Sequence, residues 1–296
     1  MAVRRRSNWY IYFIAFGVAL AFAIGVIFTF SWYLFPEEKD RPTGLTSTGE
    51  LADNFKPDAS HNFNLLTMLA DGEHDSPDLF IMVSFNAVEN RLVLIPLHNG
   101  ISMGNTGRTL PNVYAAQGGK GAIAAVRDVT GVACDAYWCI GREAFIRMMS
   151  ACGNVEYNVP KTLVVNDGTV MDTFNTGEQM FSAESAFRYI YLADFGEGEE
   201  YRFNMVCDLL CSLINQNIYN IDASLLDTVF NIVSTTSDTD ITGGLFDTRK
   251  AALLNTATYG SSPAEYYVPY GEVGGDGSFT IAENSLISIS QKCGTD

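Results

Sequence analysis

The segment FNLLTMLADGEHDSPDLFIMVSFNAVENRLVLIPLHN, residues 63–99, contains three apolar runs separated by two polar connections. The runs 63–68, 79–85 and 91–96 are rich in residues that favour strands, and the short turn 86–90 is typical of a hairpin. Near-continuous apolar runs of this length suit strands that are buried on both faces. The segment therefore predicts three strands of a sheet that is covered by helices.

Polar side chains lie where these predicted strands end. The connection after the first strand, DGEHDSPD at 71–78, is acidic and rich in turn formers, and His98 follows the third strand. We expect Asp71, Asp78 and His98 to gather at one edge of the sheet as a candidate functional site. The alternatives are that the two aspartates only form turns and that His98 only lies on the surface.

The order of these elements resembles the LytR-CpsA-Psr (LCP) family of cell-envelope glycopolymer transferases, and the resemblance covers residues 62–215. Further similar motifs are YAAQGG at 114–119 before a helix-like 122–129, the strand and helix start at 135–145, the strand at 154–160, and FSAESAFRY at 181–189. The resemblance implies an α/β fold. In this fold, an exterior domain has three layers, α/β/α, around a central mixed sheet.

The resemblance also implies a site for transfer of a glycan phosphate, a reaction that needs cations and usually a carboxylate-held divalent metal. The family's Arg-x-Asp loop falls on 76–78 (SPD), its Ile-Pro-Arg-Asp strand end on 95–98 (IPLH), its Tyr-x-Arg-x-Arg strand on 189–193 (YIYLA), and its Gly-Arg-x-x-Arg-Gln run on 198–203 (GEEYRF). Of the charged residues in these motifs, this chain retains only one aspartate, Asp78, and one arginine, Arg202. Other side chains cannot replace the fixed fork of guanidinium donors, so the sequence predicts that family catalysis is lost.

Five residues remain as candidates for binding a phosphate-bearing ligand: Asp71, Asp78, His98, Arg108 and Arg202. If activity survives, Asp78, His98 and Arg202 are the expected catalytic residues, and Asp78 is the expected ligand of a divalent metal such as Mg²⁺. A binding function requires no cofactor.

Two other interpretations bear on these candidates. Arg202 could pair with Glu199 or Glu200 instead of binding phosphate. Gly118 and Gly119, at a predicted helix start, could offer backbone N–H groups to a phosphate. These glycines lack the spacing of a Walker loop, which weakens that second interpretation.

The N-terminal part predicts a membrane anchor. At ~1.5 Å per residue, the uncharged stretch 9–35 can span a ~30 Å hydrocarbon core, and the arginines at 4–6 favour a cytoplasmic N-terminus. A cleaved signal peptide is the alternative, but the run is too long and no small-residue cleavage site follows it. We expect a cytoplasmic stub (1–8), a transmembrane helix (9–35), a stalk (36–60), an LCP-like domain (61–216) and a C-terminal continuation of that domain (217–296).

Composition argues against several kinds of function. Three of the 18 Lys and Arg lie in the stub, so the exterior part has 15 of them against 34 Asp and Glu, a net charge of −19, which repels nucleic acid. Three histidines without a Cys-x-x-Cys or His-Glu-x-x-His motif give no transition-metal site. The six cysteines fall inside predicted strands and helices, and we expect them to be buried free thiols.

The sequence leaves three hypotheses for function. The first is a single-pass membrane protein whose extracytoplasmic domain binds a polyprenyl-linked precursor, or a partner transferase, in cell-envelope glycopolymer assembly. The second is an active LCP phosphotransferase that attaches a glycopolymer to peptidoglycan. The third is a structural or sensory ectodomain in which the fold is only a scaffold, and a pocket filled by Tyr189 and Tyr191 would favour it.

Overall fold

The computed structural model describes residue 45 and residues 50–52, 55–70, 76–103, 107–166, 171–192 and 195–294, all within the unit Gly44–Asp296. The predicted transmembrane helix, 9–35, and most of the predicted stalk lie outside the described residues. Among the helices that the structure describes, none is long and apolar enough to cross a membrane.

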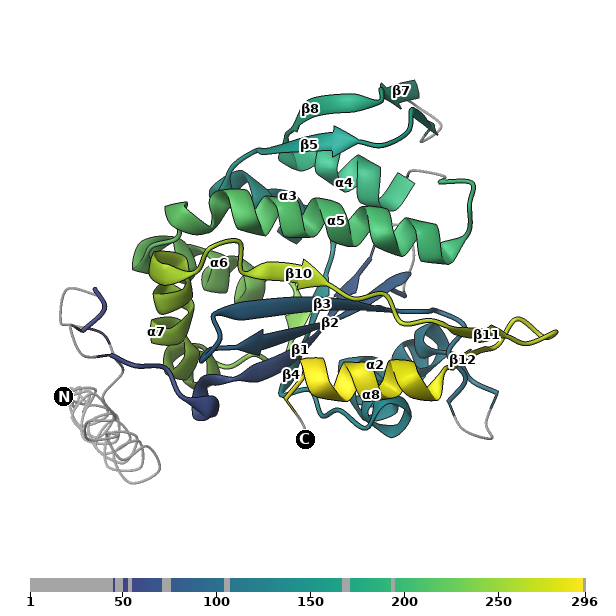
Figure 1. Cartoon of the computed structure of the whole chain (residues 1–296), viewed down its shortest axis with the longest axis horizontal. Helices are drawn as coiled ribbons and strands as arrows, with labels where there is room; N and C mark the ends of the chain where they lie inside the picture. The colour runs from purple at the N-terminus through teal and green to yellow at the C-terminus, as the bar shows by residue number, and fades with distance from the viewer. Residues whose placement is uncertain are drawn as a thin grey trace, which may run out of the picture. The chain divides into compact units, whose positions relative to one another are not determined.

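A six-stranded mixed sheet forms the centre of this unit, with the strand order β10-β3-β2-β1-β4-β9 (Figure 1). The strands are β1 (Phe63–Leu69), β2 (Leu79–Asn86), β3 (Arg91–Leu97), β4 (Ala136–Ile140), β9 (Asp238–Thr239) and β10 (Ala264–Tyr266). β1 pairs in parallel with β4, and β3 with β10, whereas the other neighbours are antiparallel. The prediction of an α/β fold with a central mixed sheet is confirmed, and so are the three strands predicted within 63–99.

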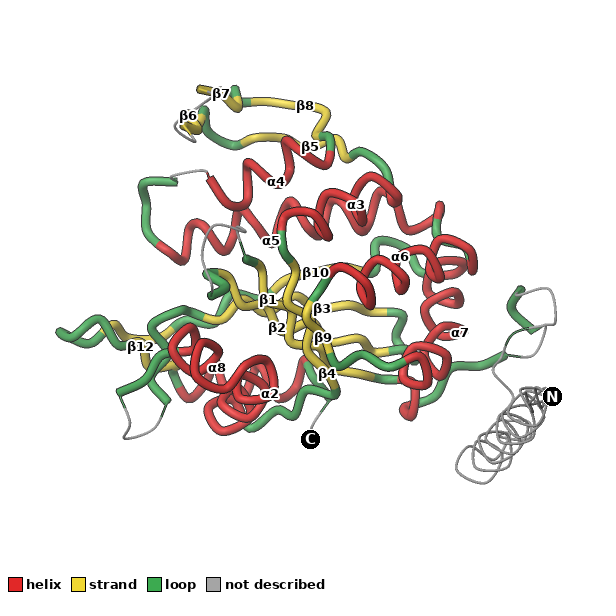
Figure 2. The backbone as a smooth tube through the Cα atoms, turned by 180° about the vertical axis from the view of Figure 1, so that it is seen from behind, coloured by secondary structure: helices red, strands yellow, loops and turns green. Residues whose placement is uncertain are grey.

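Helices lie on both faces of the sheet, as the view from behind also shows (Figure 2). They are α2 (Leu110–Thr130), α3 (Arg142–Cys152), α4 (Ala183–Leu192), α5 (Glu199–Asn217), α6 (Ala223–Thr236), α7 (Gly243–Tyr259) and α8 (Glu283–Lys292). One apolar core joins the sheet to α2 and α8, and a second joins the opposite face to α3, α4 and α5.

Successive side chains of a strand pack alternately into these two cores. In β2, Leu79 and Ile81 enter the core under α5, whereas Phe80 and Met82 enter the core over α2 and α8. All four side chains are at most 1% exposed. Because successive side chains of a strand point to opposite faces, an uninterrupted apolar run is what a strand between two helix layers requires.

The turn of the β2–β3 hairpin is hydrogen-bonded to α7. Asn90 has a positive φ of 51°, a conformation that asparagine tolerates better than most residues. Its Oδ1 accepts hydrogen bonds from Asn255 Nδ2 and Thr256 Oγ1 of α7, each at 2.9 Å. At the other end of β3, Pro96 lies beyond the residues that pair with β10, so its missing N–H leaves no gap in that ladder.

Three hairpins lie outside the central sheet. They pair β5 (Val155–Val159) with β8 (Gly177–Phe181), β6 (Leu163–Asn166) with β7 (Met171–Phe174), and β11 (Gly271–Val273) with β12 (Phe279–Ile281). β5 confirms the strand predicted at 154–160. Its Tyr157 and the Phe181 of β8 pack edge-on against Tyr189 of α4, which attaches this hairpin to the helical layer.

Two predicted elements differ from the structure. The segment 189–193, aligned with a family strand, instead continues α4 as far as Leu192. The reason is the buried stripe of Ala183, Ala186, Phe187 and Ile190, whose spacing of three and four residues is helical. The helix predicted at 122–129 is only the second half of α2, which begins at Leu110.

The α2 helix is kinked at Gly118, where φ is 66° and ψ is −166°. The helical segment that follows starts at Gly119, so the predicted helix start at this glycine pair is confirmed. A Cβ on Gly119 would lie only 2.2 Å from the ring of Tyr137 in β4. Close packing of α2 on the sheet therefore accounts for Gly119 without a phosphate, and the proposed phosphate contact stays a prediction.

All six cysteines are free, as predicted. Cys134, Cys139, Cys207 and Cys211 are buried, as expected, whereas Cys152 and Cys293 are only partly buried. Burial raises the pKa of Cys134 to about 12 and that of Cys211 to about 12. Such thiols remain protonated at neutral pH and are poor nucleophiles, which fits a packing role.

We predict that Gly119→Ala lowers the free energy of unfolding by about 1–3 kcal/mol, because a methyl group has no room beside Tyr137. Chemical denaturation of the full chain would measure the change. Gly243→Ala in α7 is the control, since nothing lies within 4 Å of an added Cβ there. Equal stability of Gly119→Ala and wild type would contradict the packing explanation.

Candidate functional site

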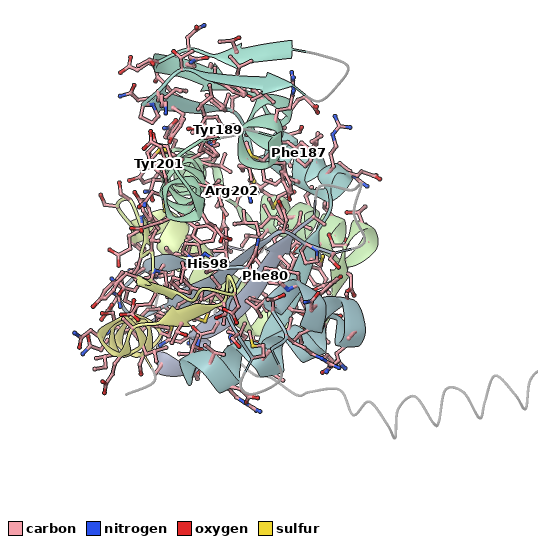
Figure 3. The ribbon with its side chains drawn as sticks, turned by 90° about the vertical axis from the view of Figure 1, so that its right-hand side faces the viewer. Phe80, His98, Phe187, Tyr189, Tyr201 and Arg202 are labelled. Carbon is pink, nitrogen blue, oxygen red and sulfur yellow. The ribbon has the colours of Figure 1, made fainter. Side chains whose placement is uncertain are left out.

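Four chain segments meet at one edge of the sheet: the end of β1, the start of β2, the end of β3 and the first turn of α5. Asp78 precedes β2, and its N–H donates a 3.2 Å hydrogen bond to the carbonyl of Leu69 in β1. Arg202 lies in the first turn of α5, with its N–H on the carbonyl of Gly198 at 3.2 Å. Figure 3 shows the side chain of Arg202 between Tyr189 and His98.

Arg202 and Asp78 form an ion pair. Arg202 Nη2 lies 2.9 Å from Asp78 Oδ2, and the same nitrogen donates to the carbonyl of Ile190 at 3.5 Å. The side chains are 21% and 46% exposed, so water screens the pair only partly. The alternative that Arg202 pairs with Glu199 or Glu200 is wrong for this structure, because its carboxylate partner is Asp78.

Asn99, which the sequence analysis missed, joins this ion pair to a second one. Its Nδ2 donates to the backbone carbonyl of Asp78 at 2.5 Å, and its N–H donates to Glu199 Oε1 at 3.1 Å. Glu199 Oε2 lies 2.7 Å from His98 Nε2. The only signal in the sequence was the position of Asn99 directly after His98.

The side chain of His98 contacts three segments: the loop after β3, α5 and β12. Its Nδ1 accepts the N–H of Gly100 at 2.9 Å, so we assign the ring proton to Nε2, which donates to Glu199. The ring stacks on Phe279 of β12 with centroids 4.4 Å apart and meets the edge of Phe203 of α5 at 6.4 Å. This makes His98 part of the packing as well as of the polar network.

Two oxygen atoms of this network, Asp78 Oδ1 and Asn99 Oδ1, are buried and have no hydrogen-bond donor among the described residues. Carboxylate and amide oxygens are suitable ligands for Mg²⁺, which binds few protein groups and keeps several waters. The described residues contain no group of three or more His, Cys, Asp or Glu side chains that could hold a metal. The two oxygens are of a type that Mg²⁺ binds, and a metal held by Asp78 stays a prediction.

An apolar cavity of about 250 Å³ lies between the sheet and helices α3 and α5. Strand residues such as Leu69, Ile81 and Leu94 line one wall, and Phe145 and Ile214 line the other. Leu69 connects the cavity to the charged edge, because its carbonyl accepts the N–H of Asp78, but none of Asp78, His98, Asn99, Glu199 and Arg202 lines the cavity.

Three of the side chains that the motif comparison places at family arginines are used in packing or pairing. Leu97 is 1% exposed and belongs to the core over α2 and α8. Tyr191 stacks on Phe187 with centroids 4.2 Å apart. Glu199 accepts the N–H of Asn99 and lies 2.7 Å from His98 Nε2.

Two further residues, Asp71 and Arg108, were predicted to bind the ligand. Asp71 lies outside the described residues. Arg108 lies two residues before α2, where its carbonyl accepts the N–H of Met103 at 2.9 Å. The structure brings Asp78, His98 and Arg202 together through Asn99 and Glu199, whereas ligand binding by Asp71 and Arg108 stays a prediction.

No protein-family model matches the chain, and no curated protein matches it. Solved structures do match. A protein from Eubacterium siraeum described as a transcription regulator has a TM-score of 0.76 at 24% identity, over 85% of this chain and 100% of that chain. B. subtilis TagV has a TM-score of 0.60 at 17% identity, over 79% and 97%. TagT bound to LIIa-WTA has a TM-score of 0.62 at 13% identity, over 85% and 98%.

At these identities the similarity establishes the fold. TagV and TagT are LCP proteins, so the unit described here has the LCP fold, and the resemblance drawn from the sequence motifs is confirmed.

We predict a coupling free energy of about 0.5–1 kcal/mol between Asp78 and Arg202, because the pair is partly shielded from solvent. A double-mutant cycle of Asp78→Asn and Arg202→Gln, followed by chemical denaturation, would measure it. The exposed pair Glu143 and Arg147 of α3 is the control and should give about 0.3 kcal/mol. Strictly additive effects of the Asp78 and Arg202 substitutions would show that the ion pair contributes nothing.

Proposed function

We propose that this chain is a membrane-anchored extracytoplasmic protein of cell-envelope glycopolymer assembly that binds a polyprenyl-linked precursor. In this proposal the isoprenoid chain enters the cavity between the sheet and α5. The phosphate groups lie at the edge formed by Asp78, His98 and Arg202. The domain holds the precursor without transferring it.

The observation that supports this proposal is that one residue, Leu69, connects an apolar cavity to a charged edge of the sheet. Leu69 lines the cavity, and its carbonyl is hydrogen-bonded to Asp78, the partner of Arg202. An amphiphile with an apolar chain and a phosphate head needs this combination. About 250 Å³ is just below the usual range of ~300–1,000 Å³ for ligand pockets, so we expect it to hold a segment of the chain.

Binding without transfer follows from the charges at the edge. Phosphoryl transfer requires cations wherever negative charge develops, and one lost donor typically costs ~10²–10³ in rate. Arg202 is the one arginine kept from the family motifs, and Asp78 already neutralises part of its charge. A single paired arginine can position a phosphate but gives little stabilisation to a transition state.

The membrane part of the proposal rests on the sequence. The apolar stretch 9–35 after three arginines would place the N-terminus in the cytoplasm and the described unit outside. The LCP fold supports an envelope role, because TagT is a protein of this fold with a structure bound to LIIa-WTA. The E. siraeum protein is described as a transcription regulator. DNA binding by this chain would conflict with a net charge of −19 on its exterior part.

A partner transferase is compatible with the same site. A second chain could supply the missing arginines at the edge formed by Asp78, His98 and Arg202. In that case this domain would bind the precursor and the partner would carry out the transfer.

The scaffold hypothesis has less support. Tyr189 and Tyr191, which would favour it if they filled the pocket, do not line the cavity between the sheet and α5. Tyr189 packs instead with Tyr157, Phe174 and Phe181 against the outer hairpins. The cavity is lined almost entirely by apolar atoms, which suits an apolar ligand.

We predict that the full chain retains a polyprenyl pyrophosphate in native mass spectrometry and that Arg202→Gln weakens this binding about tenfold, the usual worth of a charge-assisted hydrogen bond. Polyprenol, which has no phosphate, should bind wild type and Arg202→Gln equally.

Two substitutions that add a bulky side chain in different pockets test where the lipid binds. Ile214→Phe fills the cavity under α5 and should weaken both lipids, whereas Val229→Phe, in a different pocket, should weaken neither. An absence of lipid binding by wild type, with no envelope partner in cross-linking, would end this proposal.

The alternative of an active transferase is favoured by one observation, the unpaired buried oxygens of Asp78 and Asn99. With Mg²⁺ present, we predict no turnover of a lipid pyrophosphate precursor above the background of Asp78→Ala. Release of polyprenyl phosphate would be measured over time. Turnover by wild type that disappears in Asp78→Ala would establish the transferase and overturn our proposal of binding alone.

A further inference from the structure

A surface groove of about 520 Å³ lies where α6 begins and α7 ends. Ile221 and Ser224 line it at the start of α6, and Leu254 and Tyr259 line it on α7. Figure 1 places α6 and α7 at the end of the sheet opposite β11 and β12. Because His98 stacks on β12, the groove lies away from the candidate site.

Ile221 also lines the cavity between the sheet and α5, so the cavity and the groove share one residue. Arg202 lies in the first turn of α5, and Ile221 follows its last turn. A helix of 19 residues is about 28 Å long at ~1.5 Å per residue. The groove therefore meets the cavity at the end of α5 opposite the charged edge.

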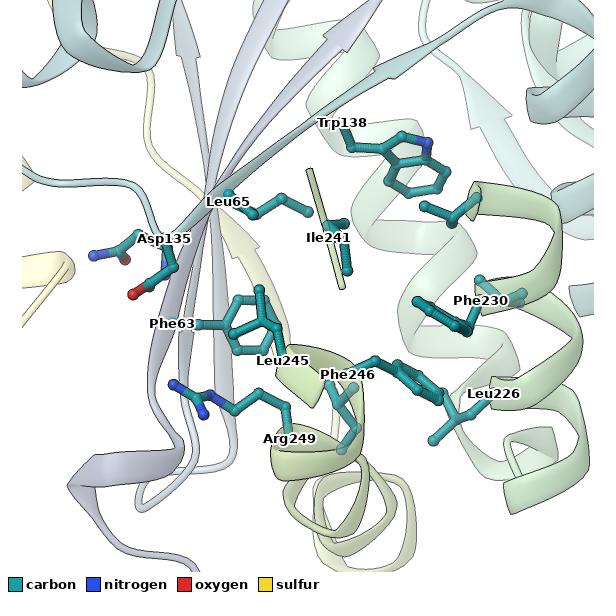
Figure 4. Close-up of a pocket in the computed structure, with 15 residues that line it drawn as sticks. Phe63, Leu65, Asp135, Trp138, Leu226, Phe230, Ile241, Leu245, Phe246 and Arg249 are labelled. Carbon is teal, nitrogen blue, oxygen red and sulfur yellow. The ribbon is translucent and has the colours of Figure 1, made fainter. Parts of the chain in front are cut away.

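A polyprenyl tail is too long for the cavity. At roughly 30 Å³ per water-sized group, its 250 Å³ holds about eight carbon atoms, fewer than two isoprene units. The rest of the tail needs a way out. Besides the groove, an apolar pocket of about 180 Å³ between the sheet, α6 and α7 shares Leu65 and Trp138 with the cavity (Figure 4). That pocket adds only about six carbon atoms, so it cannot hold a long tail either.

The chain that leads to the predicted anchor reaches the domain at the groove. Leu45 forms an antiparallel bridge with Leu51, and Leu51 lines the groove. The predicted transmembrane helix ends at residue 35, and the ten residues from there to Leu45 span at most about 35 Å. A globular unit of about 250 residues has a diameter of roughly 45 Å. The connection is shorter than the domain, so the end with the groove cannot point directly away from a membrane.

The side chains at this end suit the interfacial layer of a bilayer. Tyr259, which lines the groove, is 72% exposed, and Tyr219, two residues before Ile221, is 66% exposed. Tyrosine is enriched at membrane interfaces because its ring is apolar and its hydroxyl is polar. The described residues that line the groove include Glu50 and Asp222 but no lysine or arginine. Attraction to anionic headgroups therefore does not explain a contact here, whereas insertion of the tyrosines does.

We propose that the end of the domain formed by Leu51, Tyr219, Ile221 and Tyr259 contacts the bilayer surface, and that the polyprenyl tail passes from the cavity into the bilayer at Ile221. The inference rests on the proposed function, whose ligand it uses. The tail then runs along α5, from the edge that contains Arg202 to the membrane. The phosphate groups are held at the far end of the domain from the bilayer.

Photo-cross-linking tests the bilayer contact. The full chain would be reconstituted in phosphatidylcholine nanodiscs, with benzoylphenylalanine replacing Tyr219, Tyr259 or Tyr270 in separate variants. Tyr270, which is 50% exposed and precedes β11, is the control at the opposite end. Mass spectrometry should find about tenfold more lipid adducts at positions 219 and 259 than at 270, because interfacial tyrosines stay in the headgroup layer. Anionic lipid should not increase these adducts.

Two pyrophosphates test the exit of the tail, with native mass spectrometry of the same nanodiscs. Geranyl pyrophosphate has two isoprene units and extends little beyond the cavity, whereas a long polyprenyl pyrophosphate must leave it. Ile221→Trp should weaken the long lipid at least about tenfold, since each methylene returned to water costs about fourfold in affinity. It should keep geranyl pyrophosphate affinity within about twofold, which also shows that the variant folds. Val229→Phe, in the pocket of Figure 4, should change neither lipid.

Three results would overturn parts of this inference. Adducts as frequent at 270 as at 219 and 259 would exclude the bilayer contact, whatever the lipid binding shows. Loss of the long lipid in Val229→Phe, with normal binding in Ile221→Trp, would exclude the exit at Ile221 and leave the proposed function standing. Failure of wild type to bind either pyrophosphate would reject the proposed function and the tail exit together, whereas the adducts would still decide the bilayer contact.

Discussion

Burial of β1 and β2 on both faces is the constraint on which the rest of the structure depends. A strand with apolar side chains on each side needs two helix layers, and the chain provides α2 and α8 for one face and α3 and α5 for the other. With both faces covered, polar groups can reach solvent only at the edges of the sheet. The polar network of Asp78, Asn99, His98, Glu199 and Arg202 occurs at one such edge.

The polar network leaves little free charge at this end of the sheet. Glu199, which the motif comparison places at a family arginine, binds both His98 and the backbone of Asn99. Leu97 joins the core, and Tyr191 joins an aromatic pair with Phe187. Each of these side chains has partners in the fold, so none of the three is a cation that could contact a phosphate.

Sequence reasoning predicted the parts of the fold that repeat with a clear period. The strands within 63–99 have strong apolar patterns and were found where expected. The strand expected at 189–193 was wrong because the motif alignment was given more weight than the helical spacing of Ala186 and Ile190. The contribution of Asn99 could not be predicted, because it arises from contacts between segments far apart in the chain.

His98 is synthesised well before Phe279, the residue on which its ring stacks. His98 leaves the ribosome long before Phe279 and before β10, which completes the sheet by pairing with β3. Until those segments emerge, β3 is an open edge able to pair with another chain, and the candidate site has no wall on that side. A chain that ends before β10 would keep this open edge, which is a site for aggregation.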